Sequence, residues 1–320
     1  MLRSLKGFDW KKSKAHWFLL SKFIHPQNPN DFTKSDIWKN ILGEKPVQSI
    51  KRFLDEGLII TADLKNVLAY KYKVTELKDM LKQRGLPVSG RKDDMVERLE
   101  TADPVGMKKL ITGLTAFECT QRGRELTEKF LSYEREKHSH VEQQVLEYIK
   151  RRMFKKASLA VASYEAEQVF PRGIGIDWKH YNPANDVKMM NTIFNGKPKI
   201  LSKLSDTKLE IIRQGAAMMK LWGKNTAKEW VPPDFETGLS LDVDTVARMF
   251  SFYASHKATL DQFRKSGVVK HVKILTMHDS CDACKKMARK KYKLSEMPEL
   301  PYEHCTHEMG CRCTEIAVVQ

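Results

Sequence analysis

The chain has 320 residues, of which 41% are hydrophobic and 30% charged, so it can bury a core, and disorder over its whole length is excluded. Lysine and arginine number 56 against 40 acids, which gives a formal net charge of +16 and points to a polyanionic partner. No run of about 18 apolar residues occurs, and the stretch from Met1 to Lys14 alternates lysine with aromatic residues. We therefore expect neither a membrane span nor Sec export.

The N-terminal third predicts a leader followed by short helices. Residues 1–30 are expected to form a basic leader. Residues 31–70 have apolar residues at helical spacing and include a predicted strand over 58–60. Further on, residues 114–126 combine a strand-like stretch, a Thr120 cap and a helix. This later pattern resembles the closing wing and last helix of winged-helix domains.

The remaining segments complete a mainly α-helical, multidomain fold class. Helical spacing of Val141, Val145 and Ile149 predicts a helical middle domain, whose role the sequence does not indicate. The C-terminal part is expected to combine helices with a small, cysteine-rich α/β zinc module. The predicted domains are residues 1–30, 31–70, 71–105, 106–230 and 231–320.

Residues 71–100 predict two short helices joined by an extended loop. Thr75 can cap the first helix, and Gly85 can end it in the left-handed conformation. A Ser89-Gly90 turn then leads to the second helix, which places Arg91 and Lys92 beside backbone amides that favour a phosphate. The facing apolar residues are Leu77, Met80, Leu81, Met95, Val96 and Leu99.

This stretch resembles the SAP domain, a small helix-extended-loop-helix motif that binds DNA. The resemblance rests on the leucines of the first helix, the Gly-Leu-Pro turn at 85–87, the Ser-Gly-Arg-Lys loop at 89–92 and the closing Arg-Leu pair. It implies DNA binding with little sequence specificity. The alternative is a solvated helical hairpin, because eight bases against six acids leave residues 71–100 only mildly positive. The residues implied to contact DNA are Ser89, Gly90, Arg91 and Lys92, with Lys82, Arg84 and Arg98 as flanking phosphate contacts.

Five of the six cysteines lie within the last forty residues. In a long basic chain without a signal peptide, they favour reduced thiols in the cytoplasm over a disulfide framework. A Cys-x2-Cys pair on a tight turn can share one tetrahedral Zn²⁺, which we expect to be structural. The alternative is a metal-free set of buried or redox-active thiols. The predicted ligands are Cys281, Cys284, Cys311 and Cys313, with Cys305, His304 and His307 as alternates.

The tail also resembles the C-terminal module of phage head-morphogenesis (minor head) proteins. The shared elements are a strand-like stretch at 267–275, the Cys281-x2-Cys284 pair, Leu300-Pro301 and the closing Cys-Arg-Cys at 311–313, while the His-to-Cys spacing departs from that family. The resemblance covers about the last sixty residues. It implies a phage or mobile-element origin, virion association, and capsid or portal proteins as partners.

Catalytic residues cannot be assigned from the sequence. Asp242-x-Asp244 could bind a hard metal, but helix capping explains the pair more simply. No small-molecule site is evident. The sequence therefore predicts a DNA-binding protein with a SAP-like module and a structural zinc module. A phage minor head or DNA-packaging protein and a metal-dependent nuclease are the alternatives.

Overall fold

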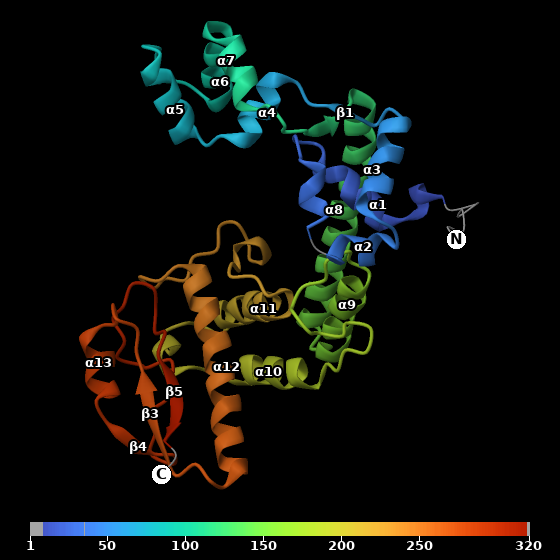
Figure 1. The fold of residues 1–320 in the computed structure, drawn as a ribbon. Coiled ribbons are helices and arrows are strands. Elements are labelled where there is room, and N and C mark those ends of the chain that lie inside the picture. The colour runs from blue at the N-terminus through green and yellow to red at the C-terminus, as the bar shows by residue number, and fades with distance from the viewer. Residues whose placement is uncertain (1–8, 35, 319–320) are drawn as a thin grey trace. The chain divides into compact units, whose positions relative to one another are not determined.

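The computed structural model describes residues 9–34 and 36–318. This part of the chain is mainly α-helical, with thirteen α-helices and five short strands, as predicted. No helix in it has the length and apolarity needed to cross a membrane. The chain divides into two compact units, residues 1–137 and 138–320 (Figure 1). The five predicted domains are a finer division and stay a prediction.

The first unit begins with short helices around a shared apolar core. Residues 1–8 of the predicted leader lie outside the described residues, but the rest of it is folded. Trp10, Leu19 and Leu20 are buried in this core. The helices are η1 (Trp10–Lys12), α1 (Lys14–Lys22), η2 (Pro29–Phe32), α2 (Asp36–Leu42) and α3 (Pro46–Asp55).

A two-stranded antiparallel sheet follows these helices. β1 (Ile59–Thr61) pairs with β2 (Phe117–Cys119), and α8 (Gln121–Lys150) begins directly after β2. The Thr120 hydroxyl accepts a hydrogen bond from the Gly123 N–H at 3.1 Å, so the predicted cap is confirmed. A Cβ on Gly123 would lie 2.0 Å from the Leu58 carbonyl oxygen, so glycine lets α8 approach the chain entering β1. The winged-helix resemblance stays a prediction.

The chain between β1 and β2 forms a helical module of its own, the inserted module (residues 64–110). Two helices of the kind predicted would bury little surface alone, and here a helix on either side enlarges their core. Leu68 of the first helix and Met107 of the last are fully buried against the central pair. The four helices are α4 (Leu64–Lys71), α5 (Val74–Gln83), α6 (Lys92–Ala102) and α7 (Pro104–Leu110).

A buried carboxylate joins α1 to α3 in the first unit. Glu44 accepts hydrogen bonds from the Ser49 hydroxyl at 2.6 Å and from Arg52 Nη1 at 2.9 Å, and it lies 3.1 Å from His16 Nε2. Burial opposes the charge on Glu44, but the hydrogen bonds from Arg52, Ser49 and His16 outweigh it and lower its pKa to about 2. This carboxylate is therefore ionised in the folded unit.

Replacing Glu44 with glutamine is expected to destabilise the first unit by about 2 kcal/mol at neutral pH. Because the pKa of Glu44 is depressed in the folded protein, its contribution is complete above its ordinary pKa of 4.5 and is lost as the pH falls toward 2. Urea unfolding of both proteins between pH 7 and pH 2 checks this. A stability difference that does not narrow in acid would contradict it.

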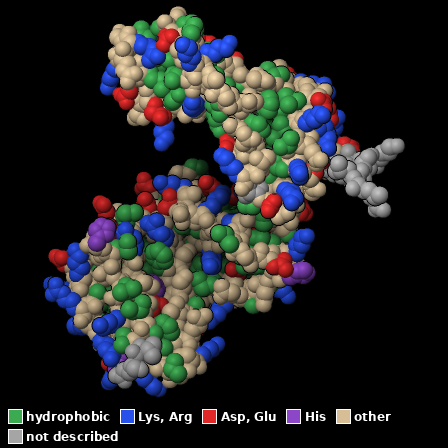
Figure 2. Space-filling model, viewed as in Figure 1, with side chains coloured by type: hydrophobic (Ala, Val, Ile, Leu, Met, Phe, Trp, Pro, Cys, Tyr) green, Lys and Arg blue, Asp and Glu red, His purple; other side chains and the backbone are tan. Residues whose placement is uncertain are grey.

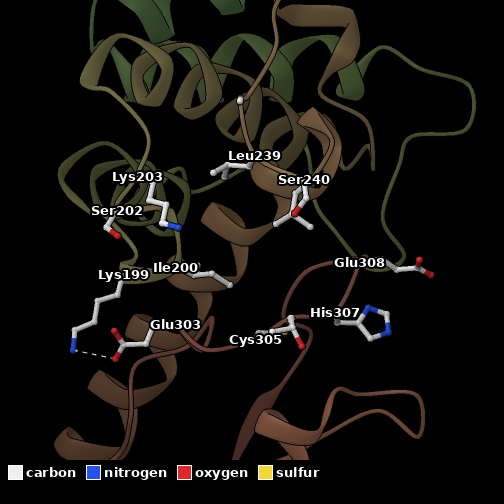
Figure 3. A pocket seen from close by; sticks show the side chains of 13 residues that line it. Lys199, Ile200, Ser202, Lys203, Leu239, Ser240, Glu303, Cys305, His307 and Glu308 are labelled. Atoms are coloured by element: carbon white, nitrogen blue, oxygen red, sulfur yellow. Dashed lines mark ion pairs between the residues drawn. The ribbon is translucent and has the colours of Figure 1, made fainter.

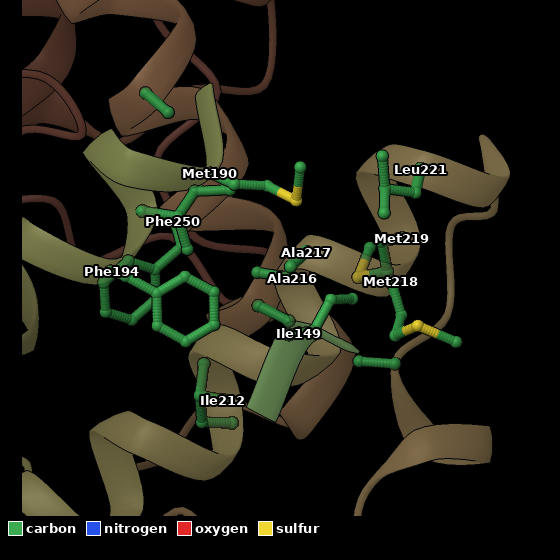
Figure 4. Close-up of a cluster of buried hydrophobic side chains, with 14 of the residues drawn as sticks. Ile149, Met190, Phe194, Ile212, Ala216, Ala217, Met218, Met219, Leu221 and Phe250 are labelled. Carbon is green, nitrogen blue, oxygen red and sulfur yellow. The ribbon is translucent and has the colours of Figure 1, made fainter. Parts of the chain in front are cut away.

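The second unit is a helical bundle with a small sheet at its C-terminal end. Figure 4 shows Ile149 of α8 and residues of three later helices, such as Phe194, Ile212 and Phe250, forming its main core. The bundle contains α9 (Phe154–Ala166), α10 (Ala184–Asn195), η3 (Lys199–Leu201), α11 (Asp206–Trp222), η4 (Lys228–Trp230) and α12 (Val243–Ser266).

The last elements form the cysteine module (residues 271–318). A three-stranded antiparallel sheet has the order β4-β3-β5, and α13 (Asp282–Ala288) lies between β3 and β4 in the chain. Leu275 at the end of β3 pairs with Thr314 at the start of β5. The cysteines that follow β3 and those that precede β5 therefore meet at one end of the sheet. Its strands are β3 (His271–Leu275), β4 (Lys291–Lys293) and β5 (Thr314–Val318).

Candidate nucleic-acid and metal sites

The loop between α5 and α6 is shaped by two glycines with positive φ. Gly85 has φ 64° and ends α5 as predicted, and the Leu86 N–H bonds back to the Leu81 carbonyl at 2.9 Å. Gly90 has φ 110°, and a Cβ on it would lie 2.8 Å from Arg98 Nη2. The loop can therefore approach the α6 side chains only with glycine at this position.

At the start of both helices of this pair, a carboxylate accepts a hydrogen bond from the backbone N–H of the N-cap residue. The Lys73 N–H donates to Glu76 at 2.6 Å, and the Arg91 N–H donates to Asp94 at 2.9 Å. The prediction that Thr75 caps α5 is wrong, because Thr75 lies within the first helical turn. Since Asp94 already occupies an amide at the start of α6, phosphate contact there depends on the neighbouring cationic side chains.

The predicted DNA-contacting loop is accessible to solvent. Ser89, Gly90 and Arg91 are exposed, and Lys92 is half-buried. Among the described residues, no acid forms an ion pair with the side chains of Arg91 or Lys92. Lys82 is also exposed and forms only a long i,i+3 pair with Asp79, at 3.7 Å. These cations remain available for a ligand.

Two of the predicted flanking arginines have partners within the module. Arg84 Nη2 donates to Asp103 at 2.8 Å, which holds the pKa of Asp103 below its usual range. Arg98 donates to the backbone carbonyls of Pro87 and Ser89. Arg84 thus ties α5 to the start of α7, and Arg98 holds the loop in shape.

The structure brings the five C-terminal cysteines together. The Sγ atoms form two overlapping groups, and within each group they lie within 4.8 Å of one another. Cys284 belongs to both groups. The Cys281 and Cys305 sulfurs are 3.8 Å apart, close to the separation of about 3.8 Å that tetrahedral Zn–S bonds of about 2.3 Å require. The groups are Cys281, Cys284 and Cys305, and Cys284, Cys311 and Cys313.

Among the described residues, neither histidine alternate joins these groups. The His304 ring packs against Tyr302, with ring centroids 5.3 Å apart. His307 is held by the Met309 N–H at 3.0 Å and by Arg312 Nη2 at 3.1 Å. Of the three predicted alternates, Cys305 is the one that lies in the cluster, and a role for His304 or His307 stays a prediction.

The surroundings of the sulfurs favour thiolates at some positions and oppose them at others. Burial opposes ionisation of Cys281, but the backbone N–H groups of Cys284 and Thr306 outweigh it and lower its pKa to about 6. Burial and the nearby Cys311 raise the pKa of Cys284. The Tyr302 N–H donates to Cys311 Sγ at 3.2 Å. A divalent cation would offset the repulsion among several thiolates, so this sulfur-rich set can hold a soft or borderline metal ion.

A cavity of 680 Å³ borders the cluster on one side. Figure 3 shows Cys305 and His307 on its wall, with Lys199 paired to Glu303 at 3.6 Å. Cys284, Cys311 and Cys313 are buried, whereas Cys305 lines this cavity. The cluster is therefore reachable from solvent on the Cys305 side.

The two carboxylates considered for a metal site accept hydrogen bonds from backbone N–H groups. Asp242 accepts the Thr245 N–H at 2.7 Å and caps α12. Asp244 accepts the N–H groups of Ala227 at 2.6 Å and Lys228 at 3.1 Å. Both acids thus fix the start of α12 and the segment beside it.

Comparisons with known proteins bear on the inserted module. No curated protein and no solved structure matches the chain. The resemblance of the tail to phage head-morphogenesis proteins therefore has no support beyond the sequence itself. Residues 71–104, which span α5, α6 and the start of α7, match the family model of the SAP domain. The chain thus carries a SAP domain, and this domain suggests nucleic-acid binding.

Proposed function

We propose that this protein binds DNA through its SAP domain, contacting phosphates with little sequence specificity. The match of residues 71–104 to the SAP family carries the proposal. The exposed side chain of Arg91 and the adjacent Lys92 support it, since both lack acidic partners among the described residues. Arg98 positions the loop that presents them.

The charges of the SAP domain favour contact with the DNA backbone over base reading. Arg91 and Lys92 carry flexible cationic side chains, which suit phosphate groups, and none of their side-chain atoms is fixed by an ion pair in the described structure. Residues 71–104 contain eight bases against seven acids. A domain so close to neutral provides few of the counterion-releasing contacts on which nonspecific affinity depends.

We further propose that the cysteine cluster holds one structural Zn²⁺. Cys281 and Cys284 with two of the other three cysteines would complete a tetrahedral set. A structural role is supported by the number of thiols in the cluster, since four protein ligands would leave no coordination position open to water, whereas a catalytic zinc keeps one. Persistence of reduced thiols requires a reducing compartment such as the cytoplasm.

The double substitution Arg91→Glu/Lys92→Glu tests the DNA-binding proposal. We expect the affinity for random duplex DNA to fall roughly 10- to 100-fold near 0.1 M salt, and the log–log salt slope to decrease by about 2. Fluorescence anisotropy at several salt concentrations measures both quantities.

Lys108→Glu/Lys109→Glu is the matched control, because it reverses two adjacent exposed lysines on α7 of the same module. It is expected to lose much less affinity. Equal losses in both variants, or no loss in the first, would overturn the proposed contact. Circular dichroism shows whether each variant keeps its helices.

A further inference from the structure

One face of the sheet in the cysteine module carries three lysines and a histidine. Side chains alternate along β3, so Val272 and Ile274 are buried while Lys273 is exposed on the opposite face. Lys273 pairs directly with Lys291 of β4, and His271 pairs with Lys293. Directly paired residues point to the same side of a sheet. We call this group, His271, Lys273, Lys291 and Lys293, the basic sheet face.

Lys273 and Lys291 lie directly opposite each other, and like charges in this position weaken a sheet. Among the described residues, no acid pairs with Lys273 or Lys291, and Lys293 has only the exposed i,i+3 partner Glu296, at 3.0 Å. A ligand carrying regularly spaced negative charges would relieve this repulsion. The basic sheet face is thus complementary to a polyanion.

The cations continue beyond the sheet. A cavity of 580 Å³ at its edge is lined by His271 and Lys293 of the basic sheet face, together with Arg264 and Lys270. Figure 2 shows lysine and arginine side chains gathered over the part of the second unit that contains α13 and β4. Four exposed cations on and after α13 also lack acidic partners in the described structure, namely Lys285, Lys286, Arg289 and Lys290.

Counts of basic and acidic residues indicate which of the two segments contributes more to electrostatic binding of DNA. Residues 264–293 contain ten lysines and arginines against two acids, whereas the SAP segment at 71–104 has eight against seven. Nonspecific affinity and its salt dependence scale with the number of phosphates that a protein neutralises. Residues 264–293, with their larger excess of cations, should therefore contribute more to both than the SAP segment does.

We propose that the basic sheet face, with the cavity at its edge, is a second DNA-binding surface that contacts the phosphates of duplex DNA. This inference rests on the proposed function only in naming DNA as the polyanion. The surface supplies most of the salt-sensitive affinity of the chain. The SAP domain supplies a smaller and separate contribution.

Lys273→Glu in the full-length, metal-loaded protein is the sharpest test. The substitution removes one phosphate contact and places a carboxylate opposite Lys291, which it partly neutralises. We expect the affinity for random duplex DNA to fall roughly 10-fold or more near 0.1 M salt, with a salt slope lower by 1 to about 2. The melting temperature should not fall, because the new cross-strand pair has opposite charges. The melting curve thus distinguishes the loss of a phosphate contact from unfolding of the variant protein.

Lys155→Glu on α9 is the matched control, since it makes the same charge change at an exposed lysine of the same unit. It should retain nearly all the affinity. If Lys273→Glu binds like the wild type, or loses no more than Lys155→Glu, the inference is overturned even where Arg91→Glu/Lys92→Glu weakens binding. If Lys273→Glu weakens DNA binding and Arg91→Glu/Lys92→Glu does not, the result supports the basic sheet face as a DNA-binding surface and contradicts the proposed SAP contact.

Discussion

Replacing Cys284 with serine is expected to release the metal and unfold the cysteine module. Cys284 belongs to both groups of sulfurs, is only 1% exposed, and packs in the core of the module with Ile274 and Met287. The binding free energy of a structural Zn²⁺ is about 10 to 16 kcal/mol, as large as the whole stability of a typical domain. A hydroxyl in place of this thiolate cannot sustain that contribution.

Metal analysis of protein purified without added zinc measures this effect. We expect about one Zn²⁺ per wild-type chain, none in Cys284→Ser, and about one in the control Cys119→Ser, which changes a buried cysteine outside the cluster. Wild-type protein without bound metal would refute the zinc proposal. Parallel analysis of Cys305→Ser and Cys313→Ser then identifies which thiols complete the tetrahedral set.

Replacing Leu99 with alanine is expected to unfold the SAP domain and to abolish its share of DNA binding. Leu99 is fully buried among the side chains of α4, α5 and α7. Such a truncation costs about 2 to 5 kcal/mol, because it removes apolar contacts and leaves a cavity. A core as small as that of the inserted module has a stability of the same order, so one such change removes most of it.

Hydrogen exchange resolved along the sequence provides the measurement. In Leu99→Ala, amides of residues 64–110 should lose protection, while those of the cysteine module keep it. Leu110→Ala is the matched control, because Leu110 lies at the end of α7 and is 38% exposed. Unchanged protection in Leu99→Ala would contradict the view that this core alone maintains the SAP domain.

Local signals in the sequence predicted much of the local structure, although the cap of α5 is Lys73 and not Thr75. The helix pair at 74–102, the end of α5 at Gly85 and the cap at Thr120 each depend on residues within one or two turns. The pairing of β1 with β2 could not be predicted in this way, because the whole inserted module separates the two strands. The contributions of α4 and α7 to the SAP core were missed for the same reason.

At the candidate sites too, the sequence predicted which residue types are present but not which groups they contact. Cysteine spacing predicted that the C-terminal thiols share one site, and the structure places all five close together, while the ligand set stays a prediction. The sequence did not indicate which groups individual side chains would contact. Arg84 pairs with Asp103, and Arg98 donates to two backbone carbonyls, so both side chains that the sequence offers as phosphate contacts make bonds within the SAP domain.

The placement of the SAP domain between two paired strands constrains its motion. Where the chain leaves and re-enters the sheet, the Ala62 N–H bonds to the Ala116 carbonyl at 2.9 Å, and Asn66 Nδ2 donates to Glu118 at 2.9 Å. A domain on a single terminal tether can swivel about one bond, whereas two adjacent tethers remove that freedom. DNA held by this domain would therefore be presented to the N-terminal helices in a restricted range of orientations. Because the two ends of the inserted module are adjacent, the module could also be replaced by a short turn without disrupting the pairing of β1 with β2.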